Sequence, residues 1–150
     1  MPEIKVKAYC VLYDADRTHH LVWVGSDPGR VERFHRLIGG HVEFGERAAA
    51  AVVREVAEEV GVTIAPRFLG VVEQLFVYAD APGHEVVFVF AADLPQPAPI
   101  PPSGGFIDDN GVAIPCVWRP VGDRSCPLFP DDVQGLLDAD LAAFAGGSGD

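Results

Sequence analysis

The spacing of apolar residues divides the chain into short strands and two helices. In several segments apolar and polar residues alternate, and β-branched and aromatic side chains are frequent, which is the pattern of β-strands. The predicted strands are residues 4–13, 21–24, 34–38, 68–78, 85–92 and 113–119. Residues 46–60 and 130–144 instead carry apolar side chains at helical spacing, and Gly61 follows the first as a stop signal.

Turn-forming residues separate these elements. Residues 14–19 are polar, residues 26–30 include Asp-Pro-Gly, and residues 95–105 hold five prolines and two glycines. The turn after residue 78 contains Asp80, Pro82 and Gly83. The order strands, helix, strands, helix predicts an α+β (mixed α/β) fold rather than a βαβ repeat. We expect one domain over residues 1–145 and a disordered tail over 146–150.

Composition narrows the function classes. The chain has 150 residues, 49% of them hydrophobic, enough for one core, and a net charge of -11. Such an acidic chain lacks the basic face needed to bind nucleic acid or an anionic membrane. The three cysteines have no CxxC spacing, so free thiols are expected. No signal peptide or transmembrane run is evident, and we expect a cytoplasmic protein.

The helix at 46–60 carries a narrow acidic sector. On a helical wheel, the apolar stripe expected to pack on the sheet consists of Ala49, Val52, Val53, Val56 and Val60. The sector beside it contains Glu55, Glu58 and Glu59, one turn after two alanines, Ala48 and Ala51. Because long side chains are missing in front of the glutamates, we expect a shallow recess with three carboxylates at one end.

Like charges at these spacings oppose helix formation by roughly 0.2–0.5 kcal/mol per pair. A divalent cation would offset that repulsion, and oxygen ligands without His or Cys favour Mg²⁺ or Mn²⁺ over zinc. The alternative is a solvated helix face, which is common. The preceding loop favours a metal site, because Gly39 and Gly40 permit close backbone approach and leave a carbonyl free to act as a ligand.

Together, the loop and helix resemble the Nudix box. The family pattern is Gly, five residues, Glu, seven residues, then Arg-Glu-apolar-x-Glu-Glu-x-Gly-apolar. The matching residues are Gly40, Glu46, Arg54, Glu55, Val56, Glu58, Glu59, Gly61 and Val62. The resemblance implies the Nudix α/β/α sandwich, with a mixed β-sheet between helices. It also implies a pyrophosphohydrolase that uses Mg²⁺ (or Mn²⁺), in which water attacks a phosphorus of a nucleoside diphosphate linked to another group.

The resemblance also implies roles for box residues. Glu55, Glu58 and Glu59 correspond to the catalytic metal ligands, joined by the carbonyl of Gly39 or Gly40. Arg54 and Glu46 correspond to a supporting pair that holds the loop against the helix. Glu43 either supports the ligands by hydrogen bonding or contacts the metal. One carboxylate serves as general base, and its identity differs between members.

Outside the box, the candidates for substrate binding are weighed against ordinary surface or core positions. Arg30 and Arg36 are the cationic candidates for a phosphate, and Tyr78 and Phe129 are aromatic candidates for stacking on a base. Glu85, on a strand, points either into the cleft or to the surface. Asp108 and Asp109, expected on the loop before the last strand, are either a further acidic ligand or solvated.

Two functions remain open at this point. The first is hydrolysis of a small nucleotide-type diphosphate: a nucleoside triphosphate, a dinucleoside polyphosphate or a nucleotide sugar. The second is a non-catalytic module that senses a nucleotide, although such modules generally lose box glutamates and this box is complete. The protein is expected to be a monomer or a homodimer.

Overall fold

The computed structural model describes residues 2–147, which form eight strands and two helices. The helices are α1 (Ala48–Val60) and α2 (Val133–Gly147). The strands are β1 (Lys5–Tyr13), β2 (His19–Asp27), β3 (Val31–His41), β4 (Arg67–Tyr78), β5 (Ala81–Asp93), β6 (Gly105–Asp109), β7 (Val112–Pro120) and β8 (Leu128–Phe129).

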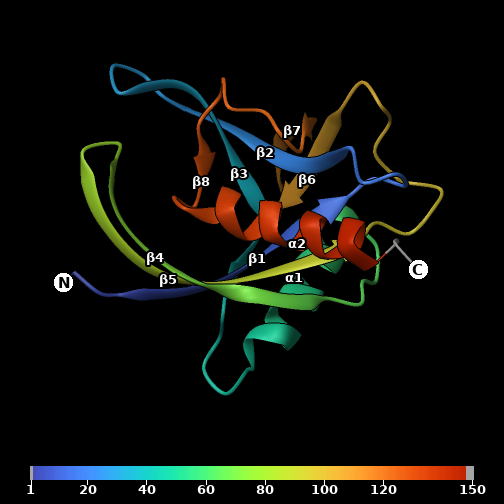
Figure 1. The fold of residues 1–150 in the computed structure, drawn as a ribbon. Helices are drawn as coiled ribbons and strands as arrows, with labels where there is room; N and C mark the ends of the chain where they lie inside the picture. The colour runs from blue at the N-terminus through green and yellow to red at the C-terminus, as the bar shows by residue number, and fades with distance from the viewer. Residues whose placement is uncertain (1, 148–150) are drawn as a thin grey trace.

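The strands form one mixed sheet in the order β4-β5-β1-β3-β2-β7-β6, with β8 paired to β3. Strand β1 runs parallel to β5 and antiparallel to β3, and β8 runs parallel to β3. Helix α2 crosses one face of the sheet and α1 lies on the other (Figure 1). The predicted α+β fold, with a mixed sheet between helices, is confirmed.

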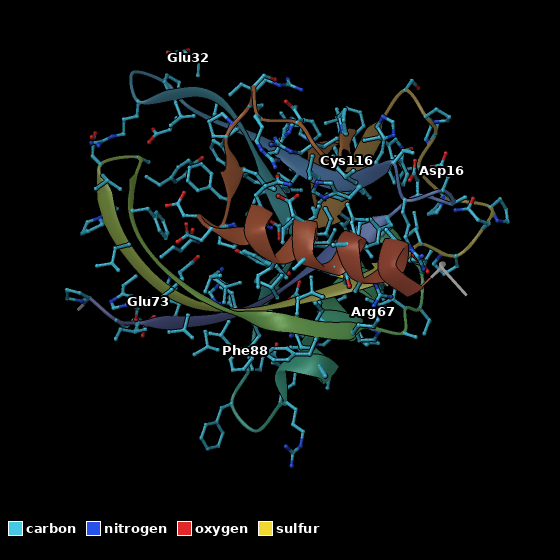
Figure 2. All side chains as sticks on the ribbon, in the orientation of Figure 1. Asp16, Glu32, Arg67, Glu73, Phe88 and Cys116 are labelled. Atoms are coloured by element: carbon cyan, nitrogen blue, oxygen red, sulfur yellow. The ribbon has the colours of Figure 1, made fainter. Side chains whose placement is uncertain are left out.

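Strand β1 contributes side chains to the hydrophobic cores on both faces of the sheet. Six consecutive residues, from Ala8 to Tyr13, are fully or almost fully buried, so the strand contributes side chains to two cores. Ala8, Cys10 and Leu12 pack in the core on the α1 side, together with Phe88, which faces α1 (Figure 2). The alternate residues Tyr9, Val11 and Tyr13 pack in the core beneath α2.

Helix α1 begins two residues later than predicted, at Ala48, and is preceded by Arg47, which makes no side-chain capping bond. Its buried face is also rotated from the predicted stripe: Ala49 is exposed, whereas Ala51 and Glu59 are buried. The acidic sector therefore faces partly into the fold. The predicted stop is confirmed, because Gly61 adopts a φ of 81° and its N–H donates to the Ala57 carbonyl.

Two hairpins differ from the prediction. The turn between β4 and β5 is only Ala79 and Asp80, with φ values of 50° and 63°, so Pro82 and Gly83 belong to β5. Asp108 and Asp109 lie on strand β6, not on a loop. Asn110 and Gly111 form the two-residue turn that follows, with φ values of 51° and 86°, which is the geometry that Asn-Gly favours in hairpins.

The C-terminal helix is shifted relative to the prediction, because it begins at Val133 and continues to Gly147. The predicted tail boundary at Gly146 therefore lies inside α2, and residues 148–150 lie outside the described part of the chain. The assignment of residues 1–145 to one domain stays a prediction. Within residues 2–147, neither helix is long and apolar enough to span a membrane.

The close contact between β1 and β3 depends on Gly39. This residue has a φ of 144°, and a Cβ built on it would lie 2.1 Å from the Ala8 carbonyl oxygen. We expect Gly39→Ala to lower the free energy of unfolding by about 2–3 kcal/mol, because it adds a backbone clash to an unfavourable φ. Chemical denaturation measures the loss.

Gly45→Ala is the matched control, because Gly45 also has a positive φ, of 83°, but open space around it. It should cost about 1 kcal/mol from backbone strain alone. Equal losses in the two variants would contradict the proposed contact.

Candidate active site

The site forms where the end of β3 passes over helix α1. Strand β3 pairs there with β1, so that Gly39 lies opposite Tyr9 and Gly40 lies opposite Ala8. A Cβ on Gly40 would lie 2.6 Å from the carboxyl carbon of Glu55. The missing side chain of Gly40 is therefore the space that the Glu55 carboxylate occupies.

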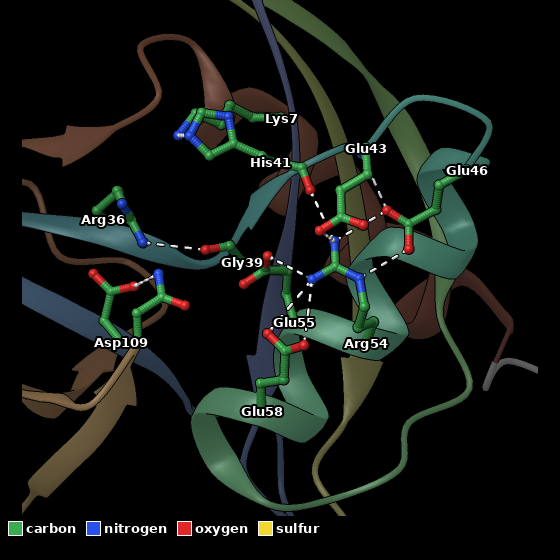
Figure 3. A network of polar contacts seen from close by, with 11 residues as sticks. Lys7, Arg36, Gly39, His41, Glu43, Glu46, Arg54, Glu55, Glu58 and Asp109 are labelled. Carbon is green, nitrogen blue, oxygen red and sulfur yellow. Dashed lines mark hydrogen bonds and ion pairs between the residues drawn. The ribbon is translucent and has the colours of Figure 1, made fainter.

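Arg54 joins the loop to the helix (Figure 3). Its Nε and Nη2 donate to the two carboxylate oxygens of Glu46 at 2.9 and 3.0 Å, and Nη2 also donates to the His41 carbonyl at 3.1 Å. The predicted contact between Arg54 and Glu46 is confirmed. These bonds lower the pKa of Glu46 and raise the pKa of Arg54, so both groups stay charged.

The same guanidinium also contacts two other box glutamates. Its Nη1 lies 3.0 Å from Glu55 Oε1 and 3.4 Å from Glu58 Oε2. Arg54 thus offsets the repulsion within the acidic sector, a role that the sequence analysis assigned only to a cation from outside. The Glu43 side chain is exposed and lies 3.8 Å from Arg54. Its predicted role, supporting the ligands or contacting the metal, stays a prediction.

Glu59 is the buried member of the acidic sector. Its residue is 7% exposed, and its Oε2 atom is buried without a hydrogen-bond partner. Burial raises the pKa of Glu59 to about 8; Arg36 opposes the shift, and Glu55 and Asp109 add to it. Because burial disfavours the ionised form of this carboxylate, a positive charge placed beside it would stabilise that form strongly.

The donor set fits a hard divalent cation, because it consists of carboxylate oxygens and glycine carbonyls. The unpaired oxygen of Glu59, close to Glu55, is the observation that supports the fit. Within residues 2–147, however, no three His, Cys, Asp or Glu side chains are gathered closely enough to hold a metal ion. Arg54 contacts both Glu55 and Glu58 in this arrangement.

A cleft of about 210 Å³ adjoins this site. Four of the predicted substrate-binding residues line it, namely Arg36, Tyr78, Glu85 and Phe129. The Arg36 guanidinium lies over the rings of Tyr9 and Trp23 and donates from Nη2 to the Gly39 carbonyl at 3.2 Å. Arg36 therefore connects the cleft to the glycine turn (Figure 3).

The other predicted substrate-binding residues, Arg30, Asp108 and Asp109, do not line the cleft. Arg30 forms an ion pair of 2.8 Å with Asp80, which ties the β2–β3 turn to the tip of the β4–β5 hairpin. Asp108 is exposed and accepts a hydrogen bond from the Gly111 N–H. Its neighbour Asp109 lies within electrostatic range of Glu59. The role of each aspartate stays a prediction.

Sequence reasoning missed several residues that line the cleft: Lys7, Trp23, Asp27 and Gln74. Lys7 is the second of two lysines in β1, after Lys5, and its ammonium lies 3.7 Å from Glu85. Burial lowers its pKa, and Glu85 opposes the shift. Its position at the start of the apolar run from Ala8 to Tyr13 was the available signal. The others come together only through the strand register.

The Nudix domain model matches residues 4–124 of the chain. The chain belongs to the Nudix family. It is thus a member of a family of hydrolases that act on phosphoanhydride bonds and generally use divalent cations. Both the recognition of the family and the prediction of this enzyme class are confirmed.

Solved Nudix structures share the fold at low sequence identity. The MutT Nudix hydrolase of Burkholderia pseudomallei has a TM-score of 0.65 and 21% identity, over 91% of this chain and 97% of that one. The dihydroneopterin triphosphate pyrophosphohydrolase of E. coli has a TM-score of 0.65 and 19% identity, over 92% and 95%.

The Nudix domain of Shewanella oneidensis NrtR, solved with ADP ribose, has a TM-score of 0.64 and 19% identity, over 95% of this chain and 90% of that one. Comparison with curated proteins gave no match. These likenesses support the fold of this Nudix protein and leave its substrate open.

The burial of Glu59 predicts a pH dependence for the metal-free protein. Its pKa is about 8 in the folded state and 4.5 when unperturbed. Folding therefore favours the protonated acid, and this contribution to stability, present below pH 4.5, is lost as the pH rises through 8. We expect wild type to lose stability relative to Glu59→Gln between pH 5 and pH 8, measured by urea denaturation in EDTA. A difference that does not change with pH would show that Glu59 is ionised throughout.

Proposed function

We propose that this Nudix protein is a Mg²⁺-dependent pyrophosphohydrolase that cleaves a phosphoanhydride bond in a nucleoside diphosphate linked to another group. The observation that carries the proposal is the buried carboxylate of Glu59. It has an unpaired oxygen close to Glu55, beneath a turn with no side chains at Gly39 and Gly40. A stable fold rarely leaves such an oxygen unpaired, and a cation provides the missing partner.

In this proposal, Glu55 and Glu59 hold Mg²⁺ or Mn²⁺ together with a carbonyl of the glycine turn. Glu58 joins them when its 3.4 Å contact with Arg54 gives way; its side chain is 54% exposed and free to turn. The ion, when bound, neutralises phosphate charge and lowers the pKa of water. The Glu46–Arg54 pair holds the glycine turn against helix α1.

The charge of the protein makes the cation necessary. The chain carries a net charge of -11, which repels a diphosphate. Lys7 and Arg36 are the cations that line the cleft beside the acidic sector. We propose that they hold phosphate oxygens while a site carboxylate takes the proton of the attacking water.

A nucleotide-type substrate is supported by the aromatic cleft next to the acidic sector. Two structural neighbours are consistent with it: one is a dihydroneopterin triphosphate pyrophosphohydrolase, and another was solved with ADP ribose. We also propose that the protein is a monomer or a homodimer and that it is cytoplasmic, as expected from the sequence.

A substrate panel tests the proposal. Nucleoside triphosphates, dinucleoside polyphosphates and nucleotide sugars are incubated with and without Mg²⁺, and released phosphate or pyrophosphate is measured. We expect Mg²⁺-dependent turnover of at least one member. Glu59→Gln should lose more than the roughly 10–100-fold typical of residues that act behind a ligand, because it removes a ligand itself.

Glu73→Gln is the matched control. Glu73 pairs with His84, is 63% exposed and lies near the edge of the sheet (Figure 2), so this variant should keep wild-type activity. Full activity in Glu59→Gln would overturn the metal assignment. Mg²⁺-dependent nucleotide binding by calorimetry without any hydrolysis would favour the nucleotide-sensing module instead.

A further inference from the structure

Helix α1 covers only part of the sheet face on which it packs. Strands β4 and β5 and the start of β1 extend beyond the helix toward the β4–β5 turn (Figure 1). Phe90 lies in the core beneath α1, and Phe88 packs against that core. Because side chains alternate along a strand, Val86 and His84 of β5 point to the same side, beyond the end of the helix.

The strand register shows which residues share this surface. Val6 of β1 lies opposite Val86 in the parallel β1–β5 pair. Leu75 of β4 lies opposite His84 in the antiparallel β4–β5 pair. Residues directly opposite each other in a sheet point to the same side. We call this surface the bare face; its exposed apolar residues are Ile4, Val6, Phe68, Val71, Leu75 and Val77.

The exposed apolar area of the bare face is large for a monomer. The exposed fractions of its six apolar residues run from 39% for Val6 to 67% for Leu75. Together they leave on the order of 500 Å² in contact with water, at the upper end of the roughly 300–600 Å² of the largest patch on a typical monomer. Two such faces packed together would bury about 1,000 Å², the area from which a specific interface is expected.

The bare face is almost free of charge, although the protein is strongly acidic. Among the residues that the described strands place on it, Glu73 is the acidic one, and its carboxylate lies 3.2 Å from His84 Nε2. The chain has a net charge of -11, so two copies repel each other where their acidic surfaces meet. A basic partner would be attracted to those acidic surfaces, whereas a second copy meets the least repulsion at the neutral apolar face.

We propose that the bare face is the contact between two copies of this chain, packed face to face about a twofold axis. Around such an axis both copies supply the same residues, so a surface without net charge is complementary to itself. Stacked sheets lie about 10 Å apart, with the side chains of the two inner faces interdigitating. The aliphatic side chains Val6, Val71 and Leu75 supply such an inner face.

The contact would lie directly behind one wall of the cleft. Gln74 and Phe76 line the cleft, and they alternate along β4 with Glu73 and Leu75 of the bare face. The second copy therefore supports the hairpin from behind and leaves the cleft side of the hairpin uncovered. The inference does not rest on the proposed reaction, because association is measured without substrate.

The molar mass of the full chain in solution tests the inference. Sedimentation equilibrium is measured in EDTA at protein concentrations from about 1 to 100 µM. We expect a reversible equilibrium that approaches twice the chain mass of 16.0 kDa. Because salt screens the repulsion between acidic copies, the dimer Kd should fall as the NaCl concentration rises. A Kd that rises with salt would indicate an interface held by ion pairs and would overturn the assignment.

Leu75→Glu should raise the dimer Kd at least about a hundredfold, because it brings an unpaired carboxylate from each copy into the apolar contact. Phe106→Glu is the matched control. Phe106 is 66% exposed, against 67% for Leu75, and lies on β6 at the opposite edge of the sheet, so this variant should dimerise like wild type. Unfolding midpoints show whether both variants are folded, and the mass of the wild-type chain needs neither variant.

Three outcomes would overturn the inference. The first is a mass of 16.0 kDa at every concentration; binding of that monomer to phosphatidylcholine vesicles would then assign the bare face to a lipid surface. The second is a dimer that folded Leu75→Glu leaves intact, and the third is a dimer that Phe106→Glu weakens equally. None of these outcomes affects the substrate panel, so the proposed function stands or fails separately.

Discussion

The close packing of the end of β3 against β1 on one side and helix α1 on the other is possible only because two consecutive positions have no side chain. Gly39 passes the β1 backbone at a distance that excludes a Cβ, and Gly40 leaves the space that Glu55 fills. With the strand this close, Glu59 is covered and its carboxylate leaves water. The raised pKa of Glu59, the unpaired oxygen and the proposed cation site all follow from this one contact.

Arg54 keeps that contact stable in an acidic protein. Its guanidinium contacts Glu46, Glu55, Glu58 and the His41 carbonyl, so that one cation neutralises part of the sector and fixes the loop. Such a pairing is partly buried, where charge–charge contacts are screened less by water than at the surface. In this arrangement Glu59 Oε2 stays without a hydrogen-bond partner.

The box and the fold class could be predicted from sequence because both depend on local patterns. Residue spacing in the helix places Glu55 and Glu59 on one face, and Gly61 ends the helix in the expected conformation. The rotation of the buried face was missed, since Ala49 and Ala51 are equally small and only packing distinguishes them. The Asn110-Gly111 turn is a local hairpin signal in the sequence, and it places Asp109 on strand β6 rather than on a loop.

The residues that line the cleft could not be predicted from the sequence, because they come together through the register between strands that are distant in the chain. Gln74 meets Glu85 across the β4–β5 pair, and Phe129 reaches Phe34 only because β8 adds to β3. Alternation predicts that a residue faces one side of a sheet, but not which distant residue shares that side. Tyr78 and Phe129 were proposed as stacking residues by position, and both line the cleft.

The location of a bound cation tests the central claim most directly. Crystals of the protein grown with Mn²⁺ would show the ion by its anomalous scattering. The account predicts a peak at coordination distance, roughly 2.0–2.3 Å, from carboxylate oxygens of Glu55 and Glu59, with a carbonyl of the glycine turn as a further ligand. A peak elsewhere, with the Glu59 carboxylate still unpaired, would contradict it.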